Sequence, residues 1–291
     1  MGYSARYHAA SLAAIFLALA VGILIGAGLG DNLLSDTEEN LRESLEQDID
    51  DARGEADDLR ADLDRERAFG ERAYPALVGD TLNGQRIGVI AFGDLPDSLS
   101  GDIEDALEPS GAQLASVVVL RVPPDVDRIA GDLGPRFDSI EQDPAGLEPI
   151  AQRLGAELVI GAGRRLNRLR DAAFVRSSGE GGRLDGVVLV RAPHGDLEDD
   201  EEAATRSLER GITAGAAGTG VPVVAVERSD SEESSVPFFA PFGVATVDSV
   251  DLTSGRTALV FTLLGAEGNF GVKETANTLL PELLQPAQAG Q

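Results

Sequence analysis

The stretch RIGVIAF, residues 86–92, decides the fold, because it is a short and almost uninterrupted apolar run. Strands with this pattern are buried on both faces, as in a mainly parallel sheet. The expected strands are 86–92, 114–120, 157–161, 186–190 and 221–226, with 244–247 as a sixth candidate. The helices expected between them are 97–108, 145–154, 198–217 and 254–265. This alternation predicts an α/β fold, a mainly parallel, doubly wound and Rossmann-like sandwich over residues 85–285.

Toward the N-terminus, an uncharged run of 21 residues, Ala9–Leu29, is long enough to cross a bilayer. At about 1.5 Å of rise per residue it extends about 31 Å, which is close to the thickness of the hydrocarbon core. We therefore predict a transmembrane anchor over residues 9–30. A cleaved signal peptide is the competing interpretation, because Gly26-Ala27-Gly28 resembles a weak cleavage site. Arg6 precedes the run and acidic residues follow it, so residues 1–8 are expected in the cytoplasm and the main domain outside.

Small residues recur at every fourth position of this segment. Small side chains at this spacing let two helices approach closely in lipid, where packing drives association. They are Ala10, Ala14, Ala18, Gly22, Gly26 and Gly30. The pattern predicts helix–helix association, although Ala and Gly are also common in apolar segments of this composition.

Residues 35–72 carry 15 acidic residues against 6 arginines, which predicts a charged, solvated helix. Ser35 and Glu38 form a candidate capping box at its start, and Pro75 is expected to end it. An imperfect heptad seam runs along it through Leu45, Ile49, Ala52, Ala56, Leu59 and Leu63. The seam predicts a coiled-coil stalk that joins two or three copies, followed by a linker over residues 79–84. The alternative is a single helix packed on the domain.

The composition excludes several classes of site and partner. The chain has no cysteine, one methionine and two histidines, so disulfides, thiolate metal sites and cysteine nucleophiles are excluded. A net charge of −26 argues against nucleic acid as a partner. Common catalytic motifs are missing from the sequence, so we expect no enzyme and no cofactor. An α/β enzyme that acts through carboxylates stays as a third hypothesis, because such folds bind ligands at strand ends.

Several residues that follow the expected strands are weak candidates for ligand binding. They are Asp94, Gly161, Gly163, Arg164 and His194. The glycines belong to a partial dinucleotide fingerprint in which Leu166 replaces the third glycine, and an ordinary turn is the simpler interpretation. His194 is the only histidine outside the anchor region, and a surface residue is the simpler interpretation for it. The acidic run at 196–202 suits the first turn of a helix better than a cation site.

Two sequence motifs carry a resemblance to a known family. The first is RYHAASLAAIFLALAVG at residues 6–22, and the second is VDSVD at 247–251, followed by GRTALV at 255–260. With Gly268 and Phe270-Gly271, they resemble the MctB-type copper-transport family of actinobacteria. The layout is similar over nearly the whole chain, up to a terminal helix that would end near Pro281. The resemblance implies a non-enzymatic cell-envelope protein of copper efflux or homeostasis, with a channel-like or outer-membrane role.

The composition argues against direct copper binding, because exported copper proteins usually bind copper through Cys, Met or His and this chain has few of them. Asp248 and Asp251 are weak candidates for metal ligands, and Asp251 also suits the N-cap of the next helix. A single helix cannot enclose a pore, so transport would require a homo-oligomer in the membrane. The alternative function is a membrane-anchored scaffold or ligand-binding module that meets other envelope proteins without coordinating copper.

Overall fold

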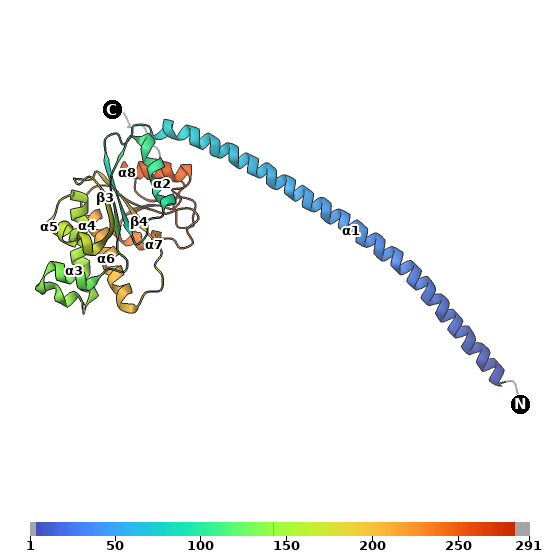
Figure 1. Cartoon of the computed structure of the whole chain (residues 1–291). Coiled ribbons are helices and arrows are strands. Elements are labelled where there is room, and N and C mark those ends of the chain that lie inside the picture. The colour runs from blue at the N-terminus through green and yellow to red at the C-terminus, as the bar shows by residue number, and fades with distance from the viewer. Residues whose placement is uncertain (1–3, 142, 283–291) are drawn as a thin grey trace, which may run out of the picture. The chain divides into compact units, whose positions relative to one another are not determined.

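A computed structural model describes residues 4–141 and 143–282, apart from the side chains of residues 4–6, 27–40, 138, 141 and 164–166. The chain divides into two units, residues 1–66 and 67–291. The described part of the first unit is helical, and the second unit contains a sheet with helices on both faces (Figure 1).

Helix α1, Ser4–Val78, is one continuous helix of 75 residues. The predicted capping box at Ser35 is therefore wrong, because the preceding turn already accepts the backbone N–H groups that a cap would serve. Pro75 lies inside the helix and does not end it. The side chains of Tyr74 and Val78 are buried on either side of Pro75, so packing holds the last turn in place.

Residues 79–84 form turns that belong to the second unit, so the prediction of a linker there is wrong. Leu82 is fully buried, and its backbone N–H donates to the carbonyl of Ser110 at 2.9 Å. The core therefore includes residues that precede the predicted start of the domain at residue 85.

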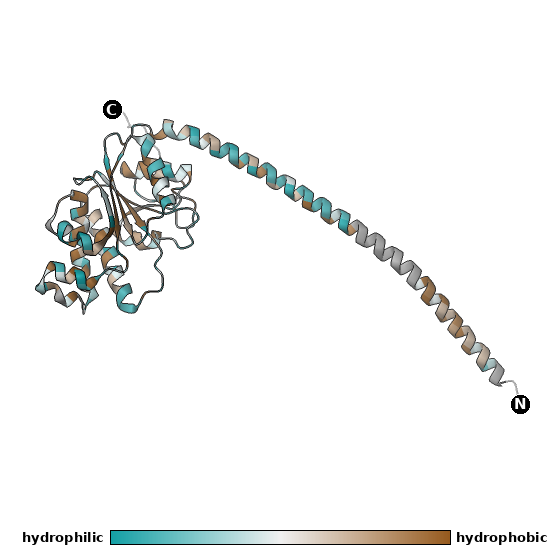
Figure 2. Cartoon of the chain, viewed as in Figure 1, coloured by the Kyte–Doolittle hydropathy of each residue, from teal (hydrophilic) through white to brown (hydrophobic). Residues whose placement is uncertain are grey.

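Within the described residues, Tyr7–Gly26 is the one helical segment long and apolar enough to cross a membrane, with a mean hydropathy of 2.5. None of this segment is buried within the protein. Figure 2 shows it as the brown part of α1, ahead of a mixed, largely hydrophilic stretch. The prediction of one apolar N-terminal helix is confirmed.

Seven strands form a single sheet in the order β3-β2-β1-β4-β5-β6-β7. They are β1 Arg86–Phe92, β2 Gln113–Leu120, β3 Phe174–Gly179, β4 Gly186–Arg191, β5 Val223–Val226, β6 Ala245–Val247 and β7 Asn269–Phe270. All neighbouring pairs are parallel except β2 and β3. The predicted α/β class with a mainly parallel sheet is confirmed.

Helices cover both faces of this sheet (Figure 1). One face carries α3 Val126–Leu133, α4 Glu148–Ile160, α5 Arg164–Ala173, α6 Asp199–Ala217 and α7 Val236–Phe239, and the other carries α2 Asp97–Leu107 and α8 Thr253–Leu263. Short 3-10 helices are η1 Glu108–Ser110, η2 Pro135–Glu141, η3 Pro144–Leu147 and η4 Ala240–Phe242. Side chains of β1 alternate between the two cores, which explains why its sequence is apolar throughout: Ile90 and Phe92 face one core, and Val89 and Ala91 face the other.

The prediction of a strand at 157–161 is wrong, because these residues form the end of α4 and its C-cap. Leu154 and Leu158 lie one helical turn apart and are both buried. A short apolar run fits a buried helix as well as a strand, so periodicity alone could not separate them. The third strand in the chain is instead β3, whose polar sequence is exposed after Phe174.

The expected terminal helix before Pro281 is also wrong for the described residues. Between Gly271 and Glu282 the chain forms bends, turns and a bridge that pairs Phe270 with Thr278. The side chain of Asp248, which directly follows β6, accepts hydrogen bonds from the backbone N–H groups of Val272 and Lys273 and so holds the start of this segment.

Helices α4 and α6 approach each other at glycines. A Cβ added to Gly155 of α4 would lie 2.4 Å from the carbonyl oxygen of Ile212. A Cβ added to Gly215 of α6 would lie 1.9 Å from the carbonyl oxygen of Gln152. Glycine is therefore needed here for close backbone approach and not for an unusual backbone angle.

We expect Gly215→Ala to lower the free energy of unfolding by about 1–3 kcal/mol, because the methyl group overpacks this contact. Gly131→Ala in α3 is the matched control, since no atom lies within 4 Å of its added Cβ. There the ordinary helix preference for Ala should stabilise the protein by about 0.5–1 kcal/mol. Urea unfolding of the full chain in detergent measures both. Stabilisation by both substitutions would contradict the close packing.

Candidate functional site

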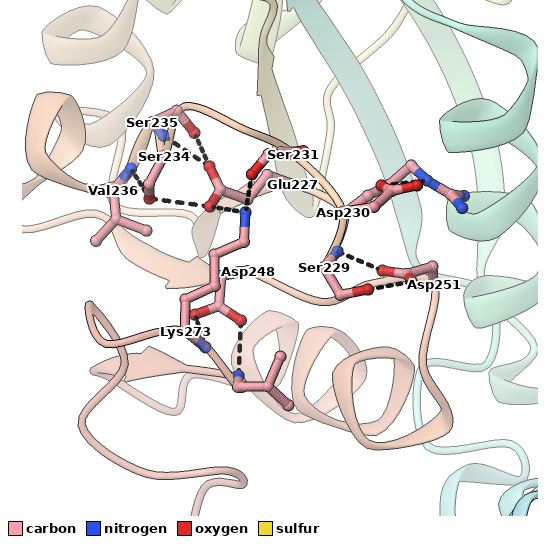
Figure 3. Close-up of polar contacts among 12 residues, drawn as sticks. Glu227, Ser229, Asp230, Ser231, Ser234, Ser235, Val236, Asp248, Asp251 and Lys273 are labelled. Carbon is pink, nitrogen blue, oxygen red and sulfur yellow. Dashed lines mark hydrogen bonds and ion pairs between the residues drawn. The ribbon is translucent and has the colours of Figure 1, made fainter. Parts of the chain in front are cut away.

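The carboxyl ends of β5, β6 and β7 bring polar residues together at one edge of the sheet. Glu227 follows β5, Asp248 follows β6, and Lys273 lies shortly after β7. Parallel strands end at the same edge, and this is where α/β sheets present their ligand sites. Glu227 is 6% exposed and Asp248 is 1% exposed. Figure 3 shows these side chains as one polar group, which we call the strand-end cluster.

The buried carboxylate of Glu227 is fully used by its neighbours. Its Oε2 accepts from the backbone N–H of Ser235 at 2.6 Å and from the Ser235 hydroxyl at 2.8 Å. Its Oε1 accepts from the Ser234 hydroxyl and from Lys273 Nζ, both at 2.9 Å. Lys273 Nζ also donates to the carbonyl of Ser231 at 3.1 Å. A buried charge is costly unless paired, so the only lysine of the chain neutralises Glu227 and fastens the 227–235 loop.

Asp248 fixes the segment that follows β7. Its Oδ1 accepts from the backbone N–H of Val272 at 2.8 Å, and its Oδ2 accepts from that of Lys273 at 3.1 Å. Gly271 has φ 142°, and a Cβ there would lie 1.8 Å from Asp248 Oδ1. Glycine at 271 is therefore required both by its backbone angle and by the carboxylate beside it.

Asp251 fixes the loop that follows β5. Its Oδ1 accepts from the backbone N–H of Ser229 at 2.7 Å, and its Oδ2 accepts from the Ser229 hydroxyl at 2.6 Å (Figure 3). Burial raises the pKa of Asp251, but these hydrogen bonds and the charge of Arg228 outweigh burial and hold the pKa below its ordinary value. The carboxylate does not cap α8, whose N-cap residue is Leu252.

A neighbouring ion pair extends these contacts to α2. Arg228 pairs with Asp102 and, at 3.2 Å, with Asp230. Burial raises the pKa of Asp102 more than the nearby Arg228 guanidinium lowers it.

The GRTALV motif holds the end of α1 within the second unit. Arg256 pairs with Glu71, and its guanidinium lies 5.4 Å from the ring centroid of Tyr74. The Thr253 hydroxyl donates to Glu71 at 3.0 Å, and the Tyr74 hydroxyl donates to the carbonyl of Ala106 at 2.6 Å. Burial raises the pKa of Tyr74, so this hydroxyl stays a donor. The motif therefore has a structural role at this joint.

The strand-end cluster is not arranged as a metal centre. Within the described residues, no three His, Asp or Glu side chains are placed to hold a metal ion together. The oxygens of Asp248 and Asp251 accept hydrogen bonds from different loops, and a cation would have to displace those donors. Their role as metal ligands stays a prediction that this geometry does not favour.

A separate cavity of about 540 Å³ lies beyond the carboxyl end of β4. Arg191 and His194 line it and contact the carboxylate of Glu209 from α6, at 3.0 Å from Arg191 Nε and 2.6 Å from His194 Nε2. Glu209 is 1% exposed. The guanidinium of Arg191 lies 4.6 Å from the ring centroid of Phe238. His194 is thus held against a buried carboxylate and is not a free surface residue.

Sequence reasoning missed Glu209, although a signal was present. Ile212 belongs to the buried face of α6, and Glu209 precedes it by three residues, which places both on the same side of the helix. A carboxylate on the apolar face of a helix requires a partner. Arg191 and His194, at the end of a neighbouring strand, supply it.

The other candidate residues do not line this cavity. Asp94 follows β1, and its Oδ1 accepts from the backbone N–H of Leu95 at 2.9 Å. Gly161 and Gly163 connect α4 to α5, so the partial dinucleotide fingerprint does not follow a strand and that interpretation is corrected. Gly161 has φ 74° and ends α4. The side chain of Arg164 lies outside the described residues.

The small residues of the apolar segment and the seam residues of α1 have no partner within the described chain. A Cβ built at Gly22 or Gly26 meets no atom within 4 Å. The residues Ala10, Ala14 and Ala18 are exposed like the rest of this segment, while the surroundings of Gly30 lie outside the described side chains. The large seam residues are each about half exposed: Leu45, Ile49, Leu59 and Leu63.

Comparison with known proteins finds relatives over nearly the whole chain. A family model described as "Copper transport outer membrane protein, MctB" matches residues 3–281. The protein named "Copper transporter MctB" from Mycobacterium tuberculosis (strain ATCC 25618 / H37Rv) is 26% identical over 310 residues, which covers 89% of this chain and 91% of that protein. The protein of the same name from Mycobacterium leprae (strain TN) is 27% identical over 335 residues, covering 95% and 98%.

We expect Lys273→Met to lower the free energy of unfolding by about 3–5 kcal/mol, because it leaves the buried Glu227 carboxylate without its cation. The double variant Glu227→Gln/Lys273→Met removes both charges and should be less destabilised than the single variant. Arg53→Met is the control, since its ion pair with Asp50 is exposed and should change stability by less than about 1 kcal/mol. Urea unfolding measures all three, and equal losses in the single and double variants would refute the pairing.

Proposed function

The chain belongs to the MctB family of copper transport outer membrane proteins, and from this premise we propose that it serves copper efflux or homeostasis as a non-enzymatic, membrane-anchored envelope protein. The observation that carries the proposal is the family match over residues 3–281. Relatives aligned along most of their own length are named copper transporters, which supports the same role for this chain.

The proposed location is a membrane with a single crossing by α1. The apolar segment Tyr7–Gly26 supports this, and Arg6 ahead of it supports an N-terminus in the cytoplasm with the sheet domain outside. The family description names the outer membrane, so contact of the domain with that membrane is the competing location.

The strand order supports the finer fold assignment, a Rossmann-like sandwich. Successive strands run from β1 to β3 toward one edge and from β4 to β7 toward the other, so the direction of winding reverses between β1 and β4. Doubly wound sheets have this arrangement. The antiparallel β3 is a departure from the ideal pattern.

A non-enzymatic role is supported by how the strand-end carboxylates are used. Glu227, Asp248 and Asp251 each accept hydrogen bonds from their own chain, and so they act as loop fasteners. With two histidines and no cysteine, soft copper ligation has little support. These facts also favour the alternative function, a scaffold or binding module that serves copper handling without coordinating the metal.

We infer a homo-oligomer held by α1. The small residues of the apolar segment and the half-exposed seam of the stalk have no partner within the described chain. A second copy offers the same seam in the same register, and anchoring in one membrane would keep the two copies parallel. The heptad spacing supports a coiled coil for this segment.

We expect Ile49→Glu/Leu59→Glu to shift the full chain in detergent toward the monomer, because both substitutions place charge in the seam. Leu41→Glu is the control, since Leu41 is equally exposed but falls outside the heptad register. Multi-angle light scattering measures the mass of each variant. An unchanged mass in the seam variant, or an equal loss in the control, would count against the coiled coil.

Deletion of the gene should raise cell-associated copper and lower copper tolerance, and the intact gene should restore both. Inductively coupled plasma mass spectrometry and growth in graded copper are the measurements. Unchanged copper content and copper tolerance in the deletion strain would contradict a role in copper efflux or homeostasis. Copper bound by the purified full chain at one ion or more per chain would instead overturn the alternative function, in which the protein serves copper handling without coordinating the metal.

A further inference from the structure

The cavity beyond β4, which we call the β4 cavity, has the size and position of a small-molecule site. Its volume of about 540 Å³ lies within the roughly 300–1,000 Å³ of known ligand pockets. It lies at the carboxyl end of a central parallel strand, the usual place for ligands in such sheets. Its lining comes from the 191–197 loop, α6 and the 237–241 segment.

The buried carboxylate of Glu209 holds a cation in a fixed position at this cavity. Both its oxygens are occupied, Oε2 by Arg191 Nε and Oε1 by His194 Nε2. Phe238 lies against the guanidinium plane of Arg191. Among the described contacts, Arg191 uses only its Nε, so the edge formed by its two terminal nitrogens is free. A guanidinium edge fixed in this way binds planar oxyanions through two parallel hydrogen bonds.

Helix α6 adds further donors to the same cavity. Arg206 and Arg210 lie one turn apart and both line it. Arg206 is paired with Glu202, and Arg210 Nε is paired with Glu148 at 3.4 Å, so each has its remaining guanidinium N–H groups to offer. Thr205 also lines it, and its buried hydroxyl oxygen has no hydrogen-bond partner in the described part of the chain. A buried hydroxyl without a partner is costly, and an acceptor in the cavity would remove that cost.

The lining of the cavity is richer in cations than the chain as a whole. The lining holds three arginines and three acids, a high share of cations for a chain with about twice as many acids as bases. Glu202 is paired with Arg206, and Glu209 is paired with Arg191 and His194. A metal ion would have to break these pairs and lie next to a guanidinium. Pro237, Phe238 and Pro241 give the cavity an apolar wall.

We propose that the β4 cavity binds a small organic carboxylate. The carboxylate takes the free edge of Arg191, and the apolar body of the ligand lies against Phe238 and Pro241. This site is independent of the copper role, and either can fail without the other.

The test uses isothermal titration calorimetry of the full chain in detergent, with benzoate as the probe. We expect saturable binding of one benzoate per chain, with acetate weaker because it lacks an apolar body. Arg191→Lys keeps a cation for Glu209 but loses the second donor edge, so benzoate should bind at least tenfold more weakly. Arg176→Lys, on the exposed strand β3, is the matched control and should leave binding unchanged.

A second variant keeps the test decisive if Arg191→Lys lowers stability. Phe238 is only half-buried, and Phe238→Ala should weaken benzoate binding about fivefold or more while circular dichroism stays native. Benzoate affinity that is unchanged in both variants would overturn the proposal. Preferential saturation by benzylamine or by Cu²⁺, lost in His194→Gln, would overturn it in favour of a cation site.

Discussion

The structure of the second unit depends on covering β1 from both sides. Its residues alternate between two cores, so helices must lie on both faces of the sheet. Covering both faces with consecutive elements requires crossover connections, and those make the neighbouring strands parallel. The carboxyl ends of parallel strands lie at one edge of the sheet. The strand-end cluster and the β4 cavity both lie at that edge because of this one requirement.

The residues that carry the family resemblance mainly hold loops and helix ends in place through hydrogen bonds and ion pairs. Asp248 holds the segment after β7, Asp251 holds the loop after β5, and Arg256 holds the end of α1. Gly271 is there because a carboxylate occupies the space of a Cβ. A family motif of this kind reflects how loops and the end of α1 are held against the sheet domain. It therefore says little about where copper would bind, and a role in copper handling does not need those residues as ligands.

Much of the fold could be predicted from the sequence, because β1, β4 and β5 are apolar runs of the length of strands. The strand expected at 157–161 failed because Leu158 and Val159 suit a buried helix equally well, and β3 was missed because its sequence is polar. Ser35 carries a local start signal and Pro75 a local stop signal, and the long helix runs through both. The site was harder to predict, because the role of His194 depends on its contact with Glu209. That contact depends on how α6 lies against β4.

Lys273 is the only lysine, and its ammonium group donates to Glu227 and to the carbonyl of Ser231. The chain thus has a single side-chain amine, and that amine also fastens the 227–235 loop. An acylating reagent must compete with these two hydrogen bonds for the nitrogen, and both are lost when the loop opens. Lysine acylation in this protein therefore reports on the opening of the 227–235 loop, and no other lysine contributes to the signal.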